Sequence, residues 1–254
     1  MPRDGGAMAR ASGERVEEGH VDAGSERASL TREQIVETAI SLVDREGVGA
    51  LSMRRLGGLM GVEAMALYRY VDGREDLLDA MVDAVTAPVE SVAAGPADAR
   101  WGGWRGYLWR LAHYMRDLAT KHPNIFPLVA TRHPAAPWLR PPLRNLDMVE
   151  EFLDTLLNSG FSQQQAAMVY RTFASFLLGH LLLTAAQEAD QGQLHQERPA
   201  LEDLGDFPRI QAMEEWLSDP GADLEEFTDS LEDLLEAIAA HVGEPRADAN
   251  GSTD

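Results

Sequence analysis

The spacing of apolar residues constrains the fold of this chain more than any other feature. Ile35, Ala39 and Leu42 recur at steps of four and three, which places them on one face of a helix. Thr31 and Gln34 form the Thr-x-x-Gln pattern of a capping box and mark the start of that helix. Later segments repeat the helical spacing, and none shows the sustained two-residue alternation of a strand. We therefore expect an all-α fold without a sheet.

Turn-forming and low-complexity segments divide the chain. Residues 1–28 and 243–254 lack periodicity, and we expect them to be disordered tails. A run of small residues around Gly95 and Pro96 suggests a boundary between one domain over 29–92 and another over 93–242. In the second domain we expect helices at about 101–121, 124–131, 141–159, 162–190, 207–218 and 223–242.

Charge is distributed unevenly. The formal net charge is −20, which argues against DNA binding driven by general attraction to phosphates. Residues 27–76, however, hold seven basic and eight acidic residues, a difference of −1. The acidic excess elsewhere would keep the rest of the protein away from DNA. The chain has no cysteine, which excludes disulfides and thiolate metal sites.

A secretory signal requires an apolar run near the first residue, and the sequence has none there. We therefore expect no secretory signal. The most apolar stretch, Phe173–Ala186, is too short to cross a bilayer and contains Ser175, Gly179 and His180. We expect a buried core helix there, no membrane contact, and a cytoplasmic protein.

The segment Leu51–Tyr70 has the order of a helix-turn-helix. Ser52 can cap a first short helix, and Gly61 can adopt the left-handed backbone of a tight turn. A second helix is expected from about Glu63 to Tyr70. Gly57 is expected where the two helices cross, because a larger side chain would push them apart there.

The second helix of this segment has an outer face that suits a DNA groove. Ala64 and Met65 can touch thymine methyl groups, and Arg69 can donate to a base edge or a phosphate. The hydroxyls of Tyr68 and Tyr70 can reach phosphate oxygens. The same residues also fit a plain helical hairpin, and composition does not separate the two interpretations.

Residues 30–82 closely resemble the N-terminal domain of the tetracycline-repressor family. The similarity has no gap and includes Leu51-Ser52, Arg54-x-Leu56, Gly61-Val62, Leu67-Tyr68, Val71 and Glu75-x-Leu77-Leu78. The resemblance implies a sequence-specific transcriptional regulator, by default a repressor that a small-molecule effector releases from its DNA operator. A helical protein-interaction module without DNA binding is the alternative.

The resemblance also implies which residues contact DNA. Arg54 falls on a base-contacting arginine, Tyr68 on a phosphate-contacting tyrosine, and Arg74 on a basic residue that meets the DNA backbone. The operator-reading positions are less polar than in the family founder, so we expect a different operator. The full set of expected DNA contacts is Ser52, Arg54, Arg55, Ala64, Met65, Ala66, Tyr68, Arg69, Tyr70 and Arg74.

The later part of the chain resembles the founding branch of the family more weakly, through Thr131-Arg132, Gly160-Phe161-Ser162 and Phe176-x-x-Gly179. This implies a homodimer in which helices at about 162–190 and 223–242 form a four-helix bundle with a second copy. A dimer would cover an apolar face that includes Ala167, Tyr170, Ala174, Leu177, Leu178 and Leu181.

The effector is expected to differ from a tetracycline–magnesium complex. By the resemblance, Leu128 falls where the founding branch has a metal-binding histidine, and Val89 and Leu183 fall on positions of polar ligand contacts. We therefore expect no metal, no cofactor and a fairly apolar effector. Candidate wall residues are Trp104, Leu108, Phe126, Leu128, Met148, Phe152, Phe173 and Phe176, with His113 and His180 as polar anchors. For any single one of them, ordinary core packing is the better explanation.

Motifs of enzymes are missing from the sequence. It contains no Gly-x-Gly-x-x-Gly, phosphate loop, His-Glu-x-x-His or Gly-x-Ser-x-Gly, and its seven histidines are scattered. We expect no enzymatic activity.

Overall fold

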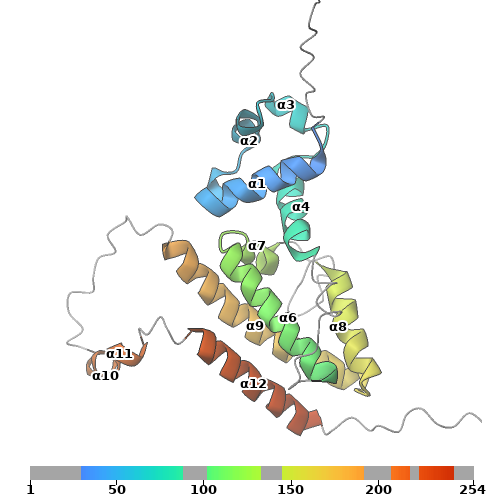
Figure 1. Cartoon of the computed structure of the whole chain (residues 1–254), viewed down its shortest axis with the longest axis vertical. Coiled ribbons are helices and arrows are strands. Elements are labelled where there is room, and N and C mark those ends of the chain that lie inside the picture. Colours follow the sequence, from blue (N-terminus) through green and yellow to red (C-terminus); the bar gives the residue numbers. More distant parts are fainter. Residues whose placement is uncertain (1–29, 88–101, 133–144, 192–206, 218–222, 243–254) are drawn as a thin grey trace, which may run out of the picture. The chain divides into compact units, whose positions relative to one another are not determined.

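The structure, a computed structural model, describes residues 30–87, 102–132, 145–191, 207–217 and 223–242 (Figure 1). Every regular element in these ranges is a helix, so the expected all-α fold is confirmed. The tails, Val89 and the boundary expected near residue 92 lie outside the described residues. The domain limits therefore remain a prediction.

The first group of helices follows the expected order. Its elements are α1 (Arg32–Glu46), the 3-10 turn η1 (Val48–Ala50), α2 (Met53–Met60), α3 (Ala64–Leu67) and α4 (Arg74–Thr86). The Thr31 hydroxyl accepts a hydrogen bond from the Gln34 amide at 3.2 Å, and the Gln34 side chain accepts one from the Thr31 amide at 3.1 Å. The Ser52 hydroxyl accepts from the Arg55 amide at 3.2 Å. Both predicted helix starts are therefore confirmed.

One compact core holds α1 to α4 together. α1 contacts α2 and α4, and α2 contacts α3. Ile35, Leu42, Leu56, Leu67 and Leu77 are fully buried in this core. Their helical spacing is the pattern that the sequence shows, because each helix turns one apolar stripe inward.

The turn between α2 and α3 depends on two glycines. Gly61 has φ +68°, a left-handed conformation that favours glycine. A Cβ on Gly57 would lie 2.8 Å from the carbonyl oxygen of Val62, so the close approach expected at this position is confirmed. Nothing lies within 4 Å of a Cβ on Gly58, and the structure does not explain that glycine.

The second helix of the motif is shorter than expected. α3 ends at Leu67, and the chain continues to Tyr70 in turns. The amides of Arg69 and Tyr70 bond to carbonyls three residues back, at 3.4 and 2.9 Å. This tighter winding leads into Val71, whose side chain is 2% exposed.

A long helix organises the second group. The elements are α6 (Gly103–Lys121), α7 (Phe126–Thr131), α8 (Leu146–Asn158), α9 (Gln163–Gln191) and α12 (Asp223–Val242). α9 contacts each of the other four, and Figure 1 shows α12 running beside it. α8 begins at Leu146 because the Asn145 side chain accepts a hydrogen bond from the Met148 amide at 3.0 Å.

The helix expected over 207–218 is two short helices, α10 (Pro208–Ala212) and α11 (Glu214–Leu217). They meet at Met213, whose ψ of 8° interrupts the helix. Large apolar side chains in this segment face solvent, and Trp216 is 80% exposed.

α9 is apolar as well as long. Within Gln163–Ala189, a window of 18 residues has a mean hydropathy of 1.4 and is 39% buried, so length and composition alone would allow the helix to cross a membrane. The expectation that this region is too short was therefore wrong by length and composition, because the helix continues on both sides of Phe173–Ala186 to a total of 29 residues. Core helices of soluble proteins meet the same criteria, so this is weak evidence for a membrane span.

Candidate nucleic-acid interface and ligand pocket

One side of the helix-turn-helix is open to solvent. Met65 is 74% exposed and Tyr68 is 47% exposed, and Arg69 is also exposed. Spacings of three and four place these side chains on one side of a helical turn, while Leu67 anchors α3 in the core. Ala64 is half-buried beside them. The expected DNA-facing residues of α3 are therefore accessible, as contact with a groove requires.

The arginines expected at this interface differ in their surroundings. Arg54 and Arg69 are exposed, and neither has an ion pair or hydrogen-bond partner among the described residues. Arg55 instead forms an ion pair with the carboxylate of Glu46. Arg54 and Arg69 are thus the cations of this motif that are free to meet a phosphate or a base.

Arg74 acts within the protein. Its Nε donates to the carbonyl oxygen of Leu51 at 3.2 Å, and its Nη2 donates to that of Val48 at 3.1 Å. These bonds attach the start of α4 to the chain that leads into α2. A contact of Arg74 with DNA remains a prediction, but its guanidinium already positions the helix-turn-helix.

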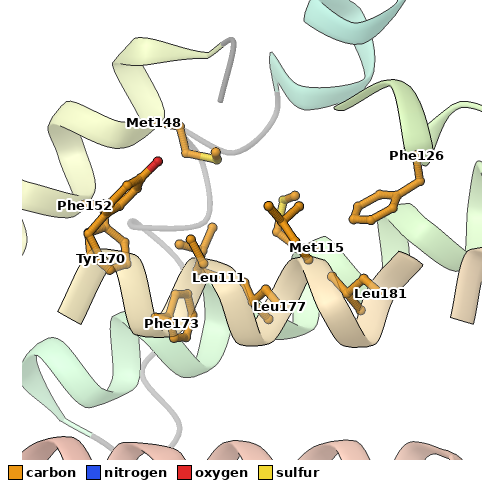
Figure 2. Close-up of a pocket in the computed structure, with 11 residues that line it drawn as sticks. Leu111, Met115, Phe126, Met148, Phe152, Tyr170, Phe173, Leu177 and Leu181 are labelled. Atoms are coloured by element: carbon orange, nitrogen blue, oxygen red, sulfur yellow. The ribbon is translucent and has the colours of Figure 1, made fainter. Parts of the chain in front are cut away.

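An apolar pocket lies between α6, α7, α8 and α9, with a cavity volume of about 40 Å³. Figure 2 shows the side chains of these helices directed toward one another around it. Its lining residues are Leu111, Met115, Phe126, Met148, Phe152, Tyr170, Phe173, Ala174, Leu177, Leu178 and Leu181. Four of the candidate wall residues, Phe126, Met148, Phe152 and Phe173, are among them.

Polar chemistry in this pocket is confined to one group. Among the lining residues that the structure describes, only Tyr170 carries a side-chain oxygen, and none is charged. Burial raises the pKa of Tyr170 to about 12, so its hydroxyl is neutral at physiological pH. Phe152 packs edge-on against Tyr170, with ring centroids 5.6 Å apart. Within the described part of the chain, no three His, Asp or Glu residues gather to hold a metal ion.

Six candidate ligand residues lie elsewhere. Trp104 is buried against the ring of Phe161, with centroids 5.2 Å apart, and Leu108 is fully buried in the core. Leu128 is half-buried and outside the lining. The remaining three surround the Phe227 ring of α12: His113, Phe176 and His180. The two histidines are therefore not anchors of this pocket, because α6 and α9 direct them toward α12.

The environment of His113 favours a neutral ring. Its ring centroid lies 3.9 Å from that of Trp109 and 5.6 Å from that of Phe227. Burial lowers the pKa of His113, and Arg116 adds to this effect while Asp117 opposes it. His113 is thus a packing residue between α6 and α12.

Sequence reasoning assigned part of the pocket to a dimer interface. Tyr170, Ala174, Leu177, Leu178 and Leu181 were expected to face a second copy, but they line the pocket. Helical spacing showed that this apolar face of α9 must be buried. It could not show whether helices of the same chain or a second copy bury it. Leu111 and Met115 of α6 were missed for the same reason.

An ion-pair cluster connects α7 to α4. Arg132, which follows α7, donates from Nε to Asp79 Oδ1 at 2.8 Å and from Nη2 to the Glu75 carbonyl at 3.0 Å. It also pairs with the Glu75 carboxylate, and its side chain is only 10% exposed. We refer to Arg132, Glu75 and Asp79 as the Arg132 clasp.

The clasp perturbs the acid–base behaviour of its members. The hydrogen bond and the charge of Arg132 lower the pKa of Glu75. Burial disfavours the charged guanidinium, but its bonds to Glu75 and Asp79 outweigh this effect and raise the pKa of Arg132.

A second contact joins the end of α6 to α1. His122 Nδ1 lies 2.8 Å from Asp44 Oδ2.

Known proteins share this arrangement of helices. Residues 96–242, more than half of the chain, match the family model of the tetracyclin repressor-like C-terminal domain. This chain belongs to the tetracycline-repressor family. The family consists of transcriptional regulators, not of enzymes.

Individual members of the tetracycline-repressor family are similar over most of the chain. HTH-type transcriptional repressor DrrR1 of Streptomyces coeruleorubidus is 28% identical over 88% of this chain and 82% of its own length. Tetracycline repressor protein class C of Escherichia coli is 29% identical over 63% of this chain and 69% of its own. A crystal structure of a possible TetR family transcriptional regulator from Streptomyces coelicolor A3(2) is 27% identical, with a TM-score of 0.66. It covers 83% of this chain and 99% of that one.

Proposed function

We propose that this protein is a cytoplasmic, dimeric repressor that a largely apolar, uncharged small molecule releases from its DNA operator. The observation that carries the proposal is the accessible surface of α3 and of the turn after it, where Met65, Tyr68 and Arg69 are exposed. Arg54 of α2 is exposed as well and has no ion-pair partner among the described residues. Repression is supported by the similar protein DrrR1, which is named a repressor.

Each exposed residue of the motif has a role that fits its chemistry. Arg54 and Arg69 supply positive charge for phosphates or guanine edges. Tyr68 can donate its hydroxyl to a phosphate and so set the register on the duplex. Arg74 holds α2 in place from within.

An uncovered face of α9 supports the dimer. Ser175, Gly179 and Leu183 recur every four residues and are exposed, Leu183 to 68%. A Cβ on Gly179 would have no neighbour within 4 Å, which leaves room for a close helix from a second copy. A two-fold dimer would cover this face and set two α3 helices one DNA turn apart.

The pocket supports an uncharged effector. An unpaired charge buried among its apolar side chains would cost several kcal/mol or more. The cavity of about 40 Å³ is smaller than the about 300 to 1,000 Å³ that is usual for small-molecule sites, so the lining side chains must move apart to admit a ligand of that size. Among the described lining residues, Tyr170 alone has a polar side-chain group.

A continuous set of contacts can couple the two sites. Phe126 lines the pocket from α7, and the Arg132 clasp joins the end of α7 to α4. Arg74, at the start of α4, binds the carbonyls that precede α2. An effector that prefers one arrangement of α7 and α4 would therefore change the affinity for DNA.

The proposal is tested by titrating the protein with duplexes selected from a random pool, using fluorescence anisotropy at several salt concentrations. We expect salt-dependent binding to a palindrome, weakened about tenfold or more by Arg54→Ala. Arg45→Ala removes an arginine of α1 that bonds to Ser41 and serves as the matched control, with little effect expected. A folded dimer that selects no duplex at low salt would instead support the helical interaction module.

A further inference from the structure

Exposed apolar side chains in the first group of helices are concentrated in one place. Between Thr31 and Ala87, the large hydrophobic residues with high exposure are Leu59, Met65, Tyr68 and Tyr70. All four belong to the helix-turn-helix, and Met65 is the most exposed of them at 74%. Such a concentration marks a contact surface.

The same surface has few groups for hydrogen-bonding a base. The side chains of α3, from Ala64 to Leu67, contain no donor and no acceptor other than the weakly accepting thioether of Met65. Arginine, asparagine and glutamine are the usual readers of purine edges in the major groove. Arg55 is engaged by Glu46 and Arg74 by backbone carbonyls, so polar recognition falls to Arg54 and Arg69 at the two ends of the motif.

We infer that Met65, with Ala64 beside it, recognises the operator through the C5 methyl group of thymine. The inference rests on the proposed function and deepens it. Thymine alone among the four bases presents a methyl group in the major groove. The flexible thioether of Met65 projects into solvent and can close around such a group, whereas half-buried Ala64 offers a small surface.

Uracil differs from thymine only by the absence of this methyl group, so it provides a direct test. Duplexes selected from a random pool are synthesised with deoxyuridine in place of one thymidine at a time, which keeps every hydrogen bond. We expect one or two positions in each half-site at which the dissociation constant rises about fourfold, the effect of one buried methyl.

Protein variants then assign the effect to Met65. With Met65→Ala, binding to the thymidine duplex weakens and the deoxyuridine penalty at that position disappears. Met65→Leu keeps an apolar side chain of similar size and should retain the penalty. Arg54→Ala is the matched control: it weakens binding to both duplexes equally, so the penalty persists. Because Met65 is exposed, thermal melting should show each variant folded like the parent.

Three results would overturn the inference. In the first, deoxyuridine changes the dissociation constant less than twofold at every position while the duplex is bound tightly. In the second, Met65→Ala leaves the penalty undiminished. In both cases the proposed function survives. In the third, the folded dimer binds no duplex, and the proposed function fails together with the inference.

Discussion

Gly57 and Gly58 are adjacent in α2 but have different surroundings. A Cβ on Gly57 would meet backbone atoms of Val62 and Ala64 at 2.8 and 3.2 Å, whereas one on Gly58 would meet open space. Backbone cannot rotate away, so Gly57→Ala should lower the free energy of unfolding by about 1–3 kcal/mol. Gly58→Ala should raise it by up to about 1 kcal/mol through helix propensity. Urea unfolding of both variants checks the pair, and equal effects would contradict the packing argument.

His113 should make the stability of the fold depend on pH. Its pKa is lowered from 6.5 by burial, so the unfolded state binds a proton more readily than the folded state. The stabilisation is therefore complete above pH 6.5 and is lost as the pH falls toward the folded pKa. We expect the melting temperature to drop between pH 7.5 and pH 5.5. His113→Phe should reduce that drop, and an unchanged pH dependence in the variant would show that other groups cause it.

Local and distant residue roles differed in how well the sequence predicted them. The caps at Thr31 and Ser52 and the close approach at Gly57 depend on neighbours within a few positions, and all three were predicted. The partners of Arg55 and Arg74 were not. Arg74 binds the carbonyl of Leu51, 23 residues earlier in the chain, and no local pattern reports such a contact.

At the scale of helices, periodicity predicted where α9 lies but not what each face touches. The face through Ala174 and Leu178 closes the pocket, and the face through Ser175, Gly179 and Leu183 is open. The break at Met213 was missed as well, because no proline or glycine marks it.

The Arg132 clasp should hold α4 and α7 together. Arg132→Ala leaves Asp79 without this partner, so backbone amides at the start of α4 should exchange hydrogen about tenfold faster. Arg171→Ala, which removes an exposed arginine of α9, should leave these amides unchanged. Hydrogen exchange followed by mass spectrometry measures both variants. Unchanged exchange in Arg132→Ala would show that apolar packing alone joins the helices.

The Arg132 clasp should weaken as the pH falls, because Glu75 becomes protonated. The pKa of Glu75 is lowered from 4.5 in the folded protein. The contribution of its carboxylate to stability is therefore present above that value and is lost as the pH falls through the folded pKa. Protection of α4 in the parent protein should therefore fall below about pH 4.5. Glu75→Gln cannot ionise, so this part of the pH dependence should be absent in that variant.

At the scale of the whole molecule, the open face of α9 predicts the assembly. Leu183→Glu places a charge on that face and should convert the dimer to monomers, with operator affinity reduced by more than about tenfold because the two half-sites no longer bind together. Leu157→Glu on α8, where Leu157 is 38% exposed, is the matched control and should remain dimeric. Light scattering after gel filtration gives the mass of each. A dimeric Leu183→Glu variant would place the interface elsewhere.

The uncharged lining of the pocket bears on how a signal reaches this protein. A compound that fits among Leu111, Phe152 and Leu177 without a counter-charge also dissolves in the hydrocarbon core of a bilayer. Such a compound enters a cell by diffusion and needs no transporter. Under the proposed function, its concentration around the regulator follows the concentration outside. The external dose at which the controlled genes respond is then set by the affinity of the pocket and by the difference in that affinity between the DNA-bound and DNA-free protein.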